Sequence, residues 1–323
     1  MVGPEKNDAV NAQEPAGLKP QTGATATGVP LAFNREPDWR LRKWVSRSMV
    51  AVAAAQDDAS LEGLLCNDAA YLRSAVEVDW VASTADGPLE IRDQTFLCGP
   101  HSKAMPLRYK GGIKVAGLMF RPGALRALFG LDEHDMLDRI TSIESVGIGD
   151  HAVTGLYEPG IDPGRWLKKI ENWLANYIEK HDVPSPDPLS QALELQAFRD
   201  PNVMLNDFAD REGVTPRQLQ RIAKRDFGLT PKQIMRRARI LDLAARLCGV
   251  ADEEEQEILL RFFDQAHQIR EFQAFFGTTP GSFKRRRSSL LTLSLEIRQA
   301  RRLEMLERIQ PGAVRPWMRS PLR

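Results

Sequence analysis

The chain has 323 residues, of which 42% are hydrophobic and 27% charged, and its formal net charge is +1. This length is more than one typical domain needs, and the composition argues against a disordered or fibrous chain. The three cysteines stand far apart, which argues against a disulfide framework and against a zinc site. No apolar run reaches the roughly 18 residues that span a bilayer. We therefore expect a soluble, cytoplasmic protein of two domains with no membrane partner.

The charge is divided unevenly between the two halves of the chain. Residues 1–184 hold 20 Lys+Arg against 25 Asp+Glu, a net charge of −5. Residues 185–323 hold 24 against 18, a net charge of +6. This asymmetry indicates that the C-terminal half faces a polyanion such as double-stranded DNA.

The first domain is predicted to be rich in strands. Residues 1–35 are rich in glycine, proline and alanine without periodicity, which predicts a disordered leader. Residues 39–55 are apolar, but neither the strand period nor the helix period is clean there. Further on, short alternating runs are separated by turn signals about every 8 to 12 residues, which predicts a small sandwich or barrel-like domain. Examples of these runs are Val76–Trp80, Leu89–Arg92 and Leu107–Lys110.

A helix is predicted after the strands. Asp162-Pro163-Gly164 is a helix start, and the apolar stripe from Trp166 to Ile178 predicts a helix that continues to Lys180. Two interpretations of the stripe stay open: it packs on its own sheet, or part of it pairs with the same helix of a second copy. A homodimer through Trp166–Ile178 would suit a DNA reader, because two-fold symmetry addresses two half-sites. Residues 181–188 contain three prolines and predict an interdomain linker.

Residues 203–247 carry the pattern of two short helices joined by a tight turn. Leu205, Phe208 and Ala209 recur at helical spacing before the break at Gly213. A second helix is predicted to begin at Thr215-Pro216 and to bury a stripe of apolar residues. Its other face is basic and rich in amides, which suits phosphates and base edges in the major groove. The candidate DNA-binding residues of this helix are Thr215, Arg217, Gln218, Arg221, Lys224 and Arg225.

Several runs in this region resemble the DNA-binding domain of AraC/XylS-type regulators. They are residues 216–221 (PRQLQR) and 226–231 (DFGLTP), with a second Phe-Gly-x-Thr-Pro ending at residues 276–280. The resemblance implies two helix-turn-helix units on either side of a linker helix, within residues 188–287. Residues 96–145 resemble the sensor-type domain of one AraC subgroup, which implies a cupin-like, effector-sensing domain within residues 36–182.

The expected fold class is therefore α+β. It combines a small β-rich (cupin-like) N-terminal domain with flanking helices and an all-α C-terminal domain with two helix-turn-helix units. The expected function is that of a sequence-specific DNA-binding transcriptional regulator, with a small-molecule or protein effector, and not that of an enzyme.

The second helix-turn-helix unit departs from the family pattern. Glu257 and Arg261 stand where the first unit has Ala209 and Gly213, and residues 252–255 are four consecutive acids. A glutamate at a close helix crossing and an arginine in a left-handed turn are both unfavourable. The side chains predicted to face outward on the second recognition helix are His267, Gln268, Arg270, Glu271 and Ala274.

Of these outward residues, His267 and Arg270 are candidates for DNA binding. Because the second unit is degenerate, we expect the first unit to dominate base reading. The alternative is a protein-interaction adaptor that uses the second unit to bind a protein.

The sequence offers no catalytic or metal-binding motif. The five histidines do not cluster and there is no glycine-rich phosphate loop, so neither a cofactor nor a metal is expected. His101 follows Gly-Pro at a predicted strand end, and Arg121 precedes a Pro-Gly helix start where backbone N–H groups can hold an anion. Each has two interpretations, as an effector-binding residue or as a structural one.

Residues 288–323 are predicted to form a basic helical extension beyond the family pattern. Residues 284–323 hold 11 Lys+Arg against 3 Asp+Glu, and the apolar spacing predicts a helix from Ser289 to Ile309. One interpretation is that the arginines contact phosphates, each adding about 0.9 to the log–log salt slope. The other is a basic tail that only adds solubility.

Overall fold

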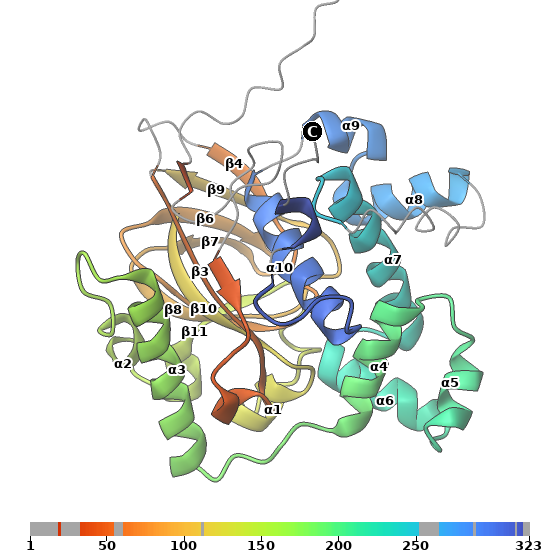
Figure 1. The fold of residues 1–323 in the computed structure, drawn as a ribbon, viewed down its shortest axis with the longest axis horizontal. Helices are drawn as coiled ribbons and strands as arrows, with labels where there is room; N and C mark the ends of the chain where they lie inside the picture. The colour runs from red at the N-terminus through yellow and green to blue at the C-terminus, as the bar shows by residue number, and fades with distance from the viewer. Residues whose placement is uncertain are drawn as a thin grey trace, which may run out of the picture.

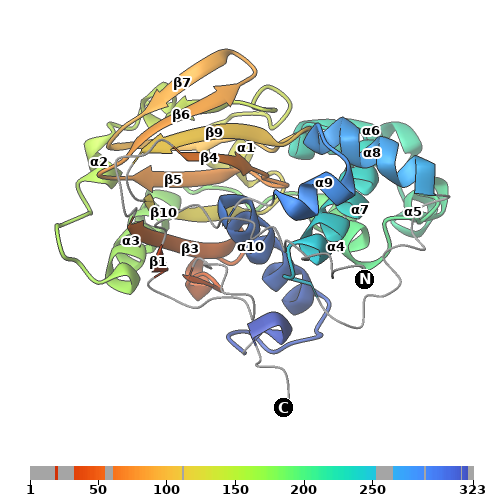
Figure 2. The ribbon, with the colours of Figure 1, turned by 90° about the horizontal axis from the view of Figure 1, so that it is seen from above.

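The computed structural model describes residues 19–20, 33–54, 61–110, 113–251, 265–286, 289–313 and 315–318. Its first part is built on two antiparallel sheets that face each other, and its second part is helical (Figures 1 and 2). The expected combination of a β-rich N-terminal domain and a helical C-terminal region is confirmed. Most of the predicted leader lies outside the described residues, but two short pieces of it are strands, β1 (Lys19–Pro20) and β2 (Phe33–Arg35).

The larger sheet has seven strands in the order β1-β3-β10-β5-β8-β11, and β2 also pairs with β3. Its centre is the antiparallel pair β3 (Val45–Ala54) and β10 (Ile113–Phe120), with Gly117 opposite Met49. β3 lacks a clean period because both its faces are buried, with Met49 between the sheets and Val50 against the outer helices. The remaining strands are β5 (Tyr71–Ala75), β8 (Gln94–Cys98) and β11 (Ile140–Ser142).

The smaller sheet has four strands in the order β4-β9-β6-β7. Its alternating strand β9 buries Leu107 and Tyr109 while Arg108 and Lys110 face solvent, as a half-buried strand does. The buried residues meet those of the larger sheet in one core between the two sheets. The four strands are β4 (Leu61–Leu65), β6 (Asp79–Thr84), β7 (Gly87–Ile91) and β9 (Met105–Lys110).

Helix α3 (Pro163–Lys180) covers the outer face of the larger sheet, against β3 and β10. It begins as predicted, with the Asp162 carboxylate accepting a hydrogen bond from the Arg165 N–H at 3.0 Å. Most of its stripe packs on its own sheet, with Trp166 only 1% exposed, whereas Trp173 and Tyr177 are partly buried. The pairing of part of this stripe with a second copy stays a prediction. Short segments complete the layer: η1 (Trp39–Leu41), α1 (Ala124–Phe129), η2 (Ile143–Val146) and α2 (His151–Thr154).

The helical region begins at Pro188, after the proline-rich segment, and α7 is its longest helix. In Figure 1, α6 and α8 lie on either side of α7, which is the position expected for a linker helix. The helices of this region are α4 (Pro188–Arg199), α5 (Leu205–Arg211), α6 (Pro216–Phe227), α7 (Pro231–Leu247), α8 (Gln265–Phe276) and α9 (Pro280–Arg285).

Helix α10 (Ser289–Met305) leaves the helical region and returns to the sheet domain (Figures 1 and 2). It packs against β3, β4 and α7, so one apolar core runs from between the sheets through α10 into α7 and α8. A short helix, η4 (Pro316–Met318), follows it. None of the described helices is long and apolar enough to cross a membrane.

Candidate nucleic-acid interface

The first helix-turn-helix unit consists of α5 and α6. Ala209 is fully buried, and Gly213 has φ +68°, the left-handed conformation that glycine adopts without steric cost. Phe208, Leu219 and Phe227 form a core of their own with residues of α4 and α7. The predicted helix, turn and helix are therefore present, and the apolar stripe of α6 faces inward.

Three cationic side chains lie on the outer face of α6. Arg217, Arg221 and Lys224 stand one helical turn apart and are all exposed. None of them forms an ion pair with a residue that the structure describes. Gln220 is exposed beside them, and its spacing of three from Arg217 was the signal that would have added it to the predicted residues. We call Arg217, Arg221 and Lys224 the α6 strip; it offers donors to phosphates and purine edges.

Helix α6 begins with a capping box. The Thr215 hydroxyl accepts a hydrogen bond from the Gln218 N–H at 3.2 Å, and the Gln218 Oε1 accepts one from the Thr215 N–H at 2.9 Å. Thr215 is thus the predicted N-cap. The side-chain oxygen of Gln218 is already engaged by Thr215. A bidentate contact from the Gln218 amide to adenine would therefore require the hydrogen bonds of the capping box to break.

Arg225 is directed away from the α6 strip. Its Nε and Nη2 each donate to the Asp226 carboxylate at 2.6 Å, and Nη2 also donates to Asp187 at 3.1 Å. The Asp226 contacts, followed by those of Asp187, raise the pKa of Arg225. Asp226 is itself buried and accepts a hydrogen bond from the Ser190 hydroxyl at 2.5 Å. Arg225 therefore anchors the end of α6 to α4 and to the segment before it.

The second unit is described only from α8 onward. Residues 252–264 lie outside the described residues, and they hold Glu257, Arg261 and the acidic run. The expected degeneracy of the first helix of this unit therefore stays a prediction.

Within α8, Glu271 does not face outward as expected. It is 8% exposed, and its carboxylate lies 3.2 Å from Arg236 Nε and 3.5 Å from Arg239 Nη2, both on α7. His267 Nε2 is 3.4 Å from the same carboxylate. The expectation that Glu271 faces outward is wrong, because the cations of the linker helix draw this carboxylate inward. His267 contacts Glu271, while Arg270 is exposed.

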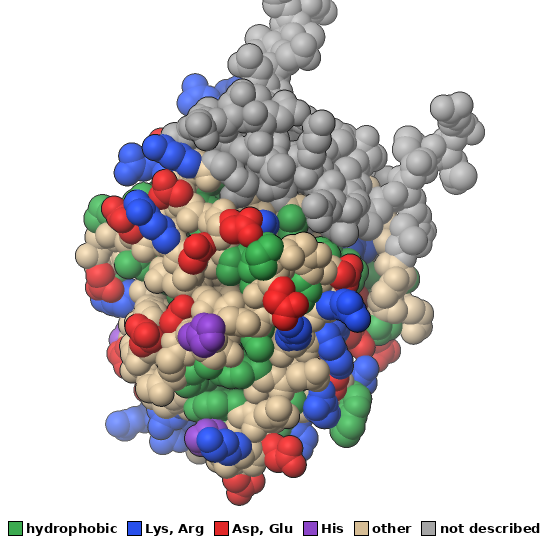
Figure 3. Space-filling view, turned by 90° about the vertical axis from the view of Figure 1, so that its left-hand side faces the viewer, with side chains coloured by type: hydrophobic (Ala, Val, Ile, Leu, Met, Phe, Trp, Pro, Cys, Tyr) green, Lys and Arg blue, Asp and Glu red, His purple; other side chains and the backbone are tan. Residues whose placement is uncertain are grey.

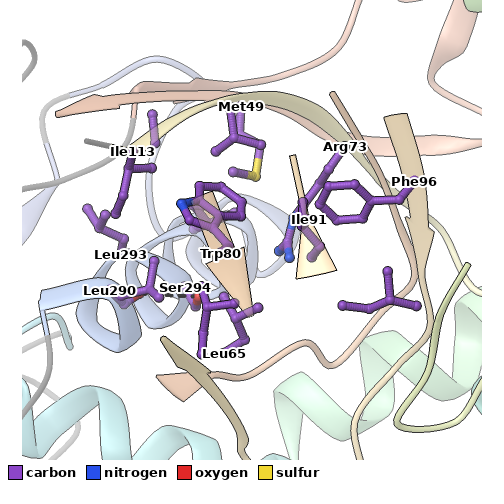
Figure 4. A pocket seen from close by; sticks show the side chains of 15 residues that line it. Met49, Leu65, Arg73, Trp80, Ile91, Phe96, Ile113, Leu290, Leu293 and Ser294 are labelled. Carbon is purple, nitrogen blue, oxygen red and sulfur yellow. Dashed lines mark hydrogen bonds between the residues drawn. The ribbon is translucent and has the colours of Figure 1, made fainter. Parts of the chain in front are cut away.

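The two effector-binding candidates both have partners within the sheet domain. His101 is fully buried, its Nδ1 accepts a hydrogen bond from the Asn67 N–H at 3.2 Å, and burial lowers its pKa to about 4. The Nε of Arg121 donates to the Arg42 carbonyl at 2.7 Å, and burial lowers the pKa of Arg121. A cavity lies between the two sheets, with Met49, Trp80 and Phe96 in its wall (Figure 4). Neither candidate lines this cavity, so their geometry matches the structural interpretations.

The arginines of α10 are buried and have protein partners. Arg298 donates from Nε to Asp68 at 2.8 Å and from Nη1 to Asp242 at 2.5 Å. Arg301 pairs with Glu194 of α4, and Arg302 Nε donates to the Phe198 carbonyl at 3.1 Å. These side chains are neither phosphate contacts nor a solvated tail, so neither interpretation of the basic extension describes α10. The exposed cations that precede it are Lys284, Arg285 and Arg286.

On the part of the sheet domain that Figure 3 shows in colour, the charged side chains do not form a strip of one sign. Figure 3 shows basic and acidic side chains interspersed over that face. The α6 strip lies on the other side, where the helical region protrudes in Figure 1.

Two segments of the chain match known domain families. Residues 208–286 match a family described as a helix-turn-helix domain, and residues 71–142 match a domain of unknown function (DUF6597). No curated protein matches the chain. Among solved structures it is similar to ToxT from Vibrio cholerae, with 10% identity, a TM-score of 0.44, and coverage of 73% of this chain and 97% of that one.

Two further solved structures resemble the chain. Unsaturated fatty acid bound ToxT from Vibrio cholerae is 12% identical, with a TM-score of 0.42 and coverage of 73% of this chain and 94% of that one. The AraC-like transcriptional activator CuxR is 12% identical, with a TM-score of 0.27 and coverage of 65% and 86%. The C-terminal part of this chain, over residues 208–286, is an AraC-type helix-turn-helix domain, as expected for a transcription regulator.

Proposed function

We propose that the first helix-turn-helix unit supplies most of the sequence-specific DNA contact, with α6 in the major groove. The observation that carries this proposal is the α6 strip, which is exposed and has no carboxylate partner among the described residues. The recognition helix of the second unit, α8, offers less, because His267 is engaged by Glu271 and leaves Arg270 as the exposed cation of this helix. A side chain that reads one base supports about 1–3 kcal/mol of binding.

The sheet domain is proposed as the regulatory part, because it holds both units of the helical region by hydrogen bonds. Arg237 of α7 donates to the carbonyls of His101 at 3.1 Å and Asp68 at 2.7 Å. The Ala104 N–H donates to the Phe275 carbonyl of α8 at 2.9 Å, and the Glu133 N–H donates to the Arg225 carbonyl of α6 at 3.0 Å. A conformational change in the sheet domain would therefore act directly on α6, α7 and α8 through these hydrogen bonds.

The test begins with duplexes that the full chain selects from a random library. On the selected duplex, the double variant Arg217→Ala, Arg221→Ala is expected to lose roughly 30-fold or more in affinity. The double variant His267→Ala, Arg270→Ala is expected to lose less than roughly fivefold, because Arg270 is its one exposed cation. Binding is measured by titrated gel shift at one fixed salt concentration, since affinity for DNA depends steeply on salt.

The matched control is Arg92→Ala with Arg108→Ala, which removes the same charge from exposed positions of the sheet domain. Equal losses from the two helix variants would contradict the dominance of the first unit. If the wild-type chain selects no sequence at all, the regulator proposal fails and the protein-interaction adaptor becomes the better reading.

A further inference from the structure

A pocket of about 100 Å³ lies where the sheet domain meets α7 and α8. Its mouth is formed by exposed residues of all three parts: Ser102 of the sheet domain, Gln233 of α7 and Ala274 of α8. Its floor is formed by buried residues, among them Arg237 of α7 and Phe275 of α8. A ligand in this pocket would therefore lie against both domains.

Arg237 is a buried cation in this pocket, and it lacks an anion. It is 5% exposed, and its Nη1 and Nη2 donate to the carbonyls of His101 at 3.1 Å and Asp68 at 2.7 Å. No carboxylate among the described residues lies within ion-pair distance of Arg237, and the Asp68 carboxylate pairs instead with Arg298. Burying a cation without an anion is costly, so an anion bound in the pocket would offset this cost.

Gln233, one helical turn before Arg237, offers a free donor. Its side-chain oxygen accepts hydrogen bonds from the Thr230 N–H and the Thr230 hydroxyl, both at 2.9 Å, in the capping box of α7. This leaves the amide N–H groups of Gln233 for a ligand. Ser102 adds no such donor, because its N–H donates to the Asp138 carboxylate at 2.8 Å and its hydroxyl donates to the same group.

Arg236 adds positive charge beside Arg237 in the pocket wall. Its Nε lies 3.2 Å from the Glu271 carboxylate, and Arg239 Nη2 lies 3.5 Å from the same carboxylate. One carboxylate is thus shared by two guanidinium groups, while Arg237 has none. The terminal nitrogens of Arg236 are therefore available to an anion.

We propose that this pocket binds a free phosphate ion, held by Arg237, Arg236 and the Gln233 amide. Guanidinium groups pair with phosphate oxygens through parallel hydrogen bonds, which makes arginine the common phosphate-binding residue. The pocket has room for roughly seven water-sized groups, which is enough for phosphate and too little for a ligand with a long apolar tail.

Bound phosphate would favour the arrangement in which the two domains are in contact. Its main ligand, Arg237, also donates to two carbonyls of the sheet domain, so the pocket exists as a whole only while α7 is docked there. A ligand that binds one arrangement shifts the population toward it. The pocket is separate from the α6 strip, so phosphate binding does not depend on DNA reading by α6.

The test is calorimetric titration of the full chain with sodium phosphate and, separately, with sodium acetate, at one constant ionic strength. The wild-type chain is expected to bind phosphate at least roughly tenfold more tightly, because acetate offers the arginines less charge and fewer oxygens. Gln233→Glu keeps a side-chain oxygen for the capping box but replaces the amide donor with a carboxylate. It is expected to weaken phosphate binding at least roughly tenfold.

The matched control is Gln218→Glu, which makes the same change in the capping box of α6. It lies outside the pocket and is expected to change phosphate affinity by less than roughly twofold. Arg237→Met is expected to remove phosphate binding. If circular dichroism shows that Arg237→Met does not fold, the two glutamine variants decide the question.

Three results would overturn the proposal: no binding of phosphate to the wild-type chain, equal binding of phosphate and acetate, or equal affinities in Gln233→Glu and Gln218→Glu. Gel shifts of the selected duplex at constant ionic strength separate free phosphate from the phosphates of DNA. If phosphate weakens duplex binding by the wild-type chain but not by Gln233→Glu, the pocket receives the DNA backbone and the proposal fails. Phosphate binding without sequence-selective DNA binding would instead contradict the proposed function alone.

Discussion

Two arginine-bearing helices of this protein use the same side chain in opposite ways. On α6, Arg217 and Arg221 are exposed and have no carboxylate partner among the described residues. On α10, Arg298 and Arg301 are at most 2% exposed and lie against carboxylates of other elements. The number of basic residues in a segment therefore says little about DNA contact, because the partners of each guanidinium decide whether it can bind a phosphate.

The largest expected effect is a loss of stability when the ion pairs of Arg298 on α10 are removed. Arg298→Met leaves Asp68 and Asp242 without their shared cation, which is expected to lower the free energy of unfolding by about 3–5 kcal/mol. Arg217→Met, the same change on α6, is expected to alter it by no more than about 0.5 kcal/mol. Urea unfolding followed by circular dichroism measures both. Similar values for the two variants would show that the contrast between the helices is wrong.

A second prediction concerns the end of α6, which is buried although the strip is exposed. Glu133 of the sheet domain is 2% exposed, and its carboxylate accepts a hydrogen bond from the Gly123 N–H at 3.3 Å. Burial, and then repulsion by Asp226, raises the pKa of Glu133 well above its usual value. Gly228, which ends α6, lies so close that an added Cβ would meet the Glu133 carbonyl at 2.7 Å.

The direction of the pH effect follows from this raised pKa. As the pH rises above the ordinary glutamate pKa, the unfolded chain releases a proton that folded Glu133 retains, so the folded state loses stability until the pH passes the folded pKa. Glu133→Gln removes this loss, and its stability relative to wild type is expected to rise by up to about 1.4 kcal/mol per pH unit in that window. Unfolding at several pH values measures the rise, and the exposed Glu62→Gln is the control. A parallel dependence in wild type and Glu133→Gln would refute the assignment.

The smallest expected effect concerns the contribution of Lys224, on the α6 strip, to the salt dependence of DNA binding. Lys224→Ala is expected to reduce the log–log salt slope of DNA binding by about 0.9, the share of one phosphate contact. Lys180→Ala removes an exposed lysine from the end of α3 and is expected to leave the slope unchanged. Gel shifts of the selected duplex over a range of salt concentrations give both slopes. A smaller slope in Lys180→Ala would place part of the DNA on the sheet domain.

Local patterns predicted the first helix-turn-helix unit well. The spacing of Phe208, Ala209 and Gly213, and the Thr-Pro start of α6, are properties of neighbouring residues that determine local structure directly. β3 was missed because a strand that is buried on both faces has no alternation. Arg225 was misplaced for a geometric reason: one residue beyond Lys224 on a helix is a rotation of about 100°, which carries Arg225 to Asp187 and Asp226.

The placement of α10 was not predictable from local patterns. Its helix is visible in the spacing of its leucines, but its partners Asp68, Glu194 and Asp242 lie far away in the sequence. The same holds for Glu271, whose burial depends on Arg236 and Arg239 of α7. A single sequence shows which residues are charged, whereas the pairing of those charges is a property of the tertiary structure.

Because α10 packs on the sheet domain, the core of that domain is completed only after the end of the chain has been synthesised. The ribosome makes both sheets first, but their shared interior lacks a wall until the whole helix-turn-helix region and then α10 have been made. A product that terminates early would expose apolar surface on its oldest domain and would be a ready substrate for chaperones and proteases. We therefore expect a chain that is truncated before α10 to be less stable and more readily degraded than the full chain.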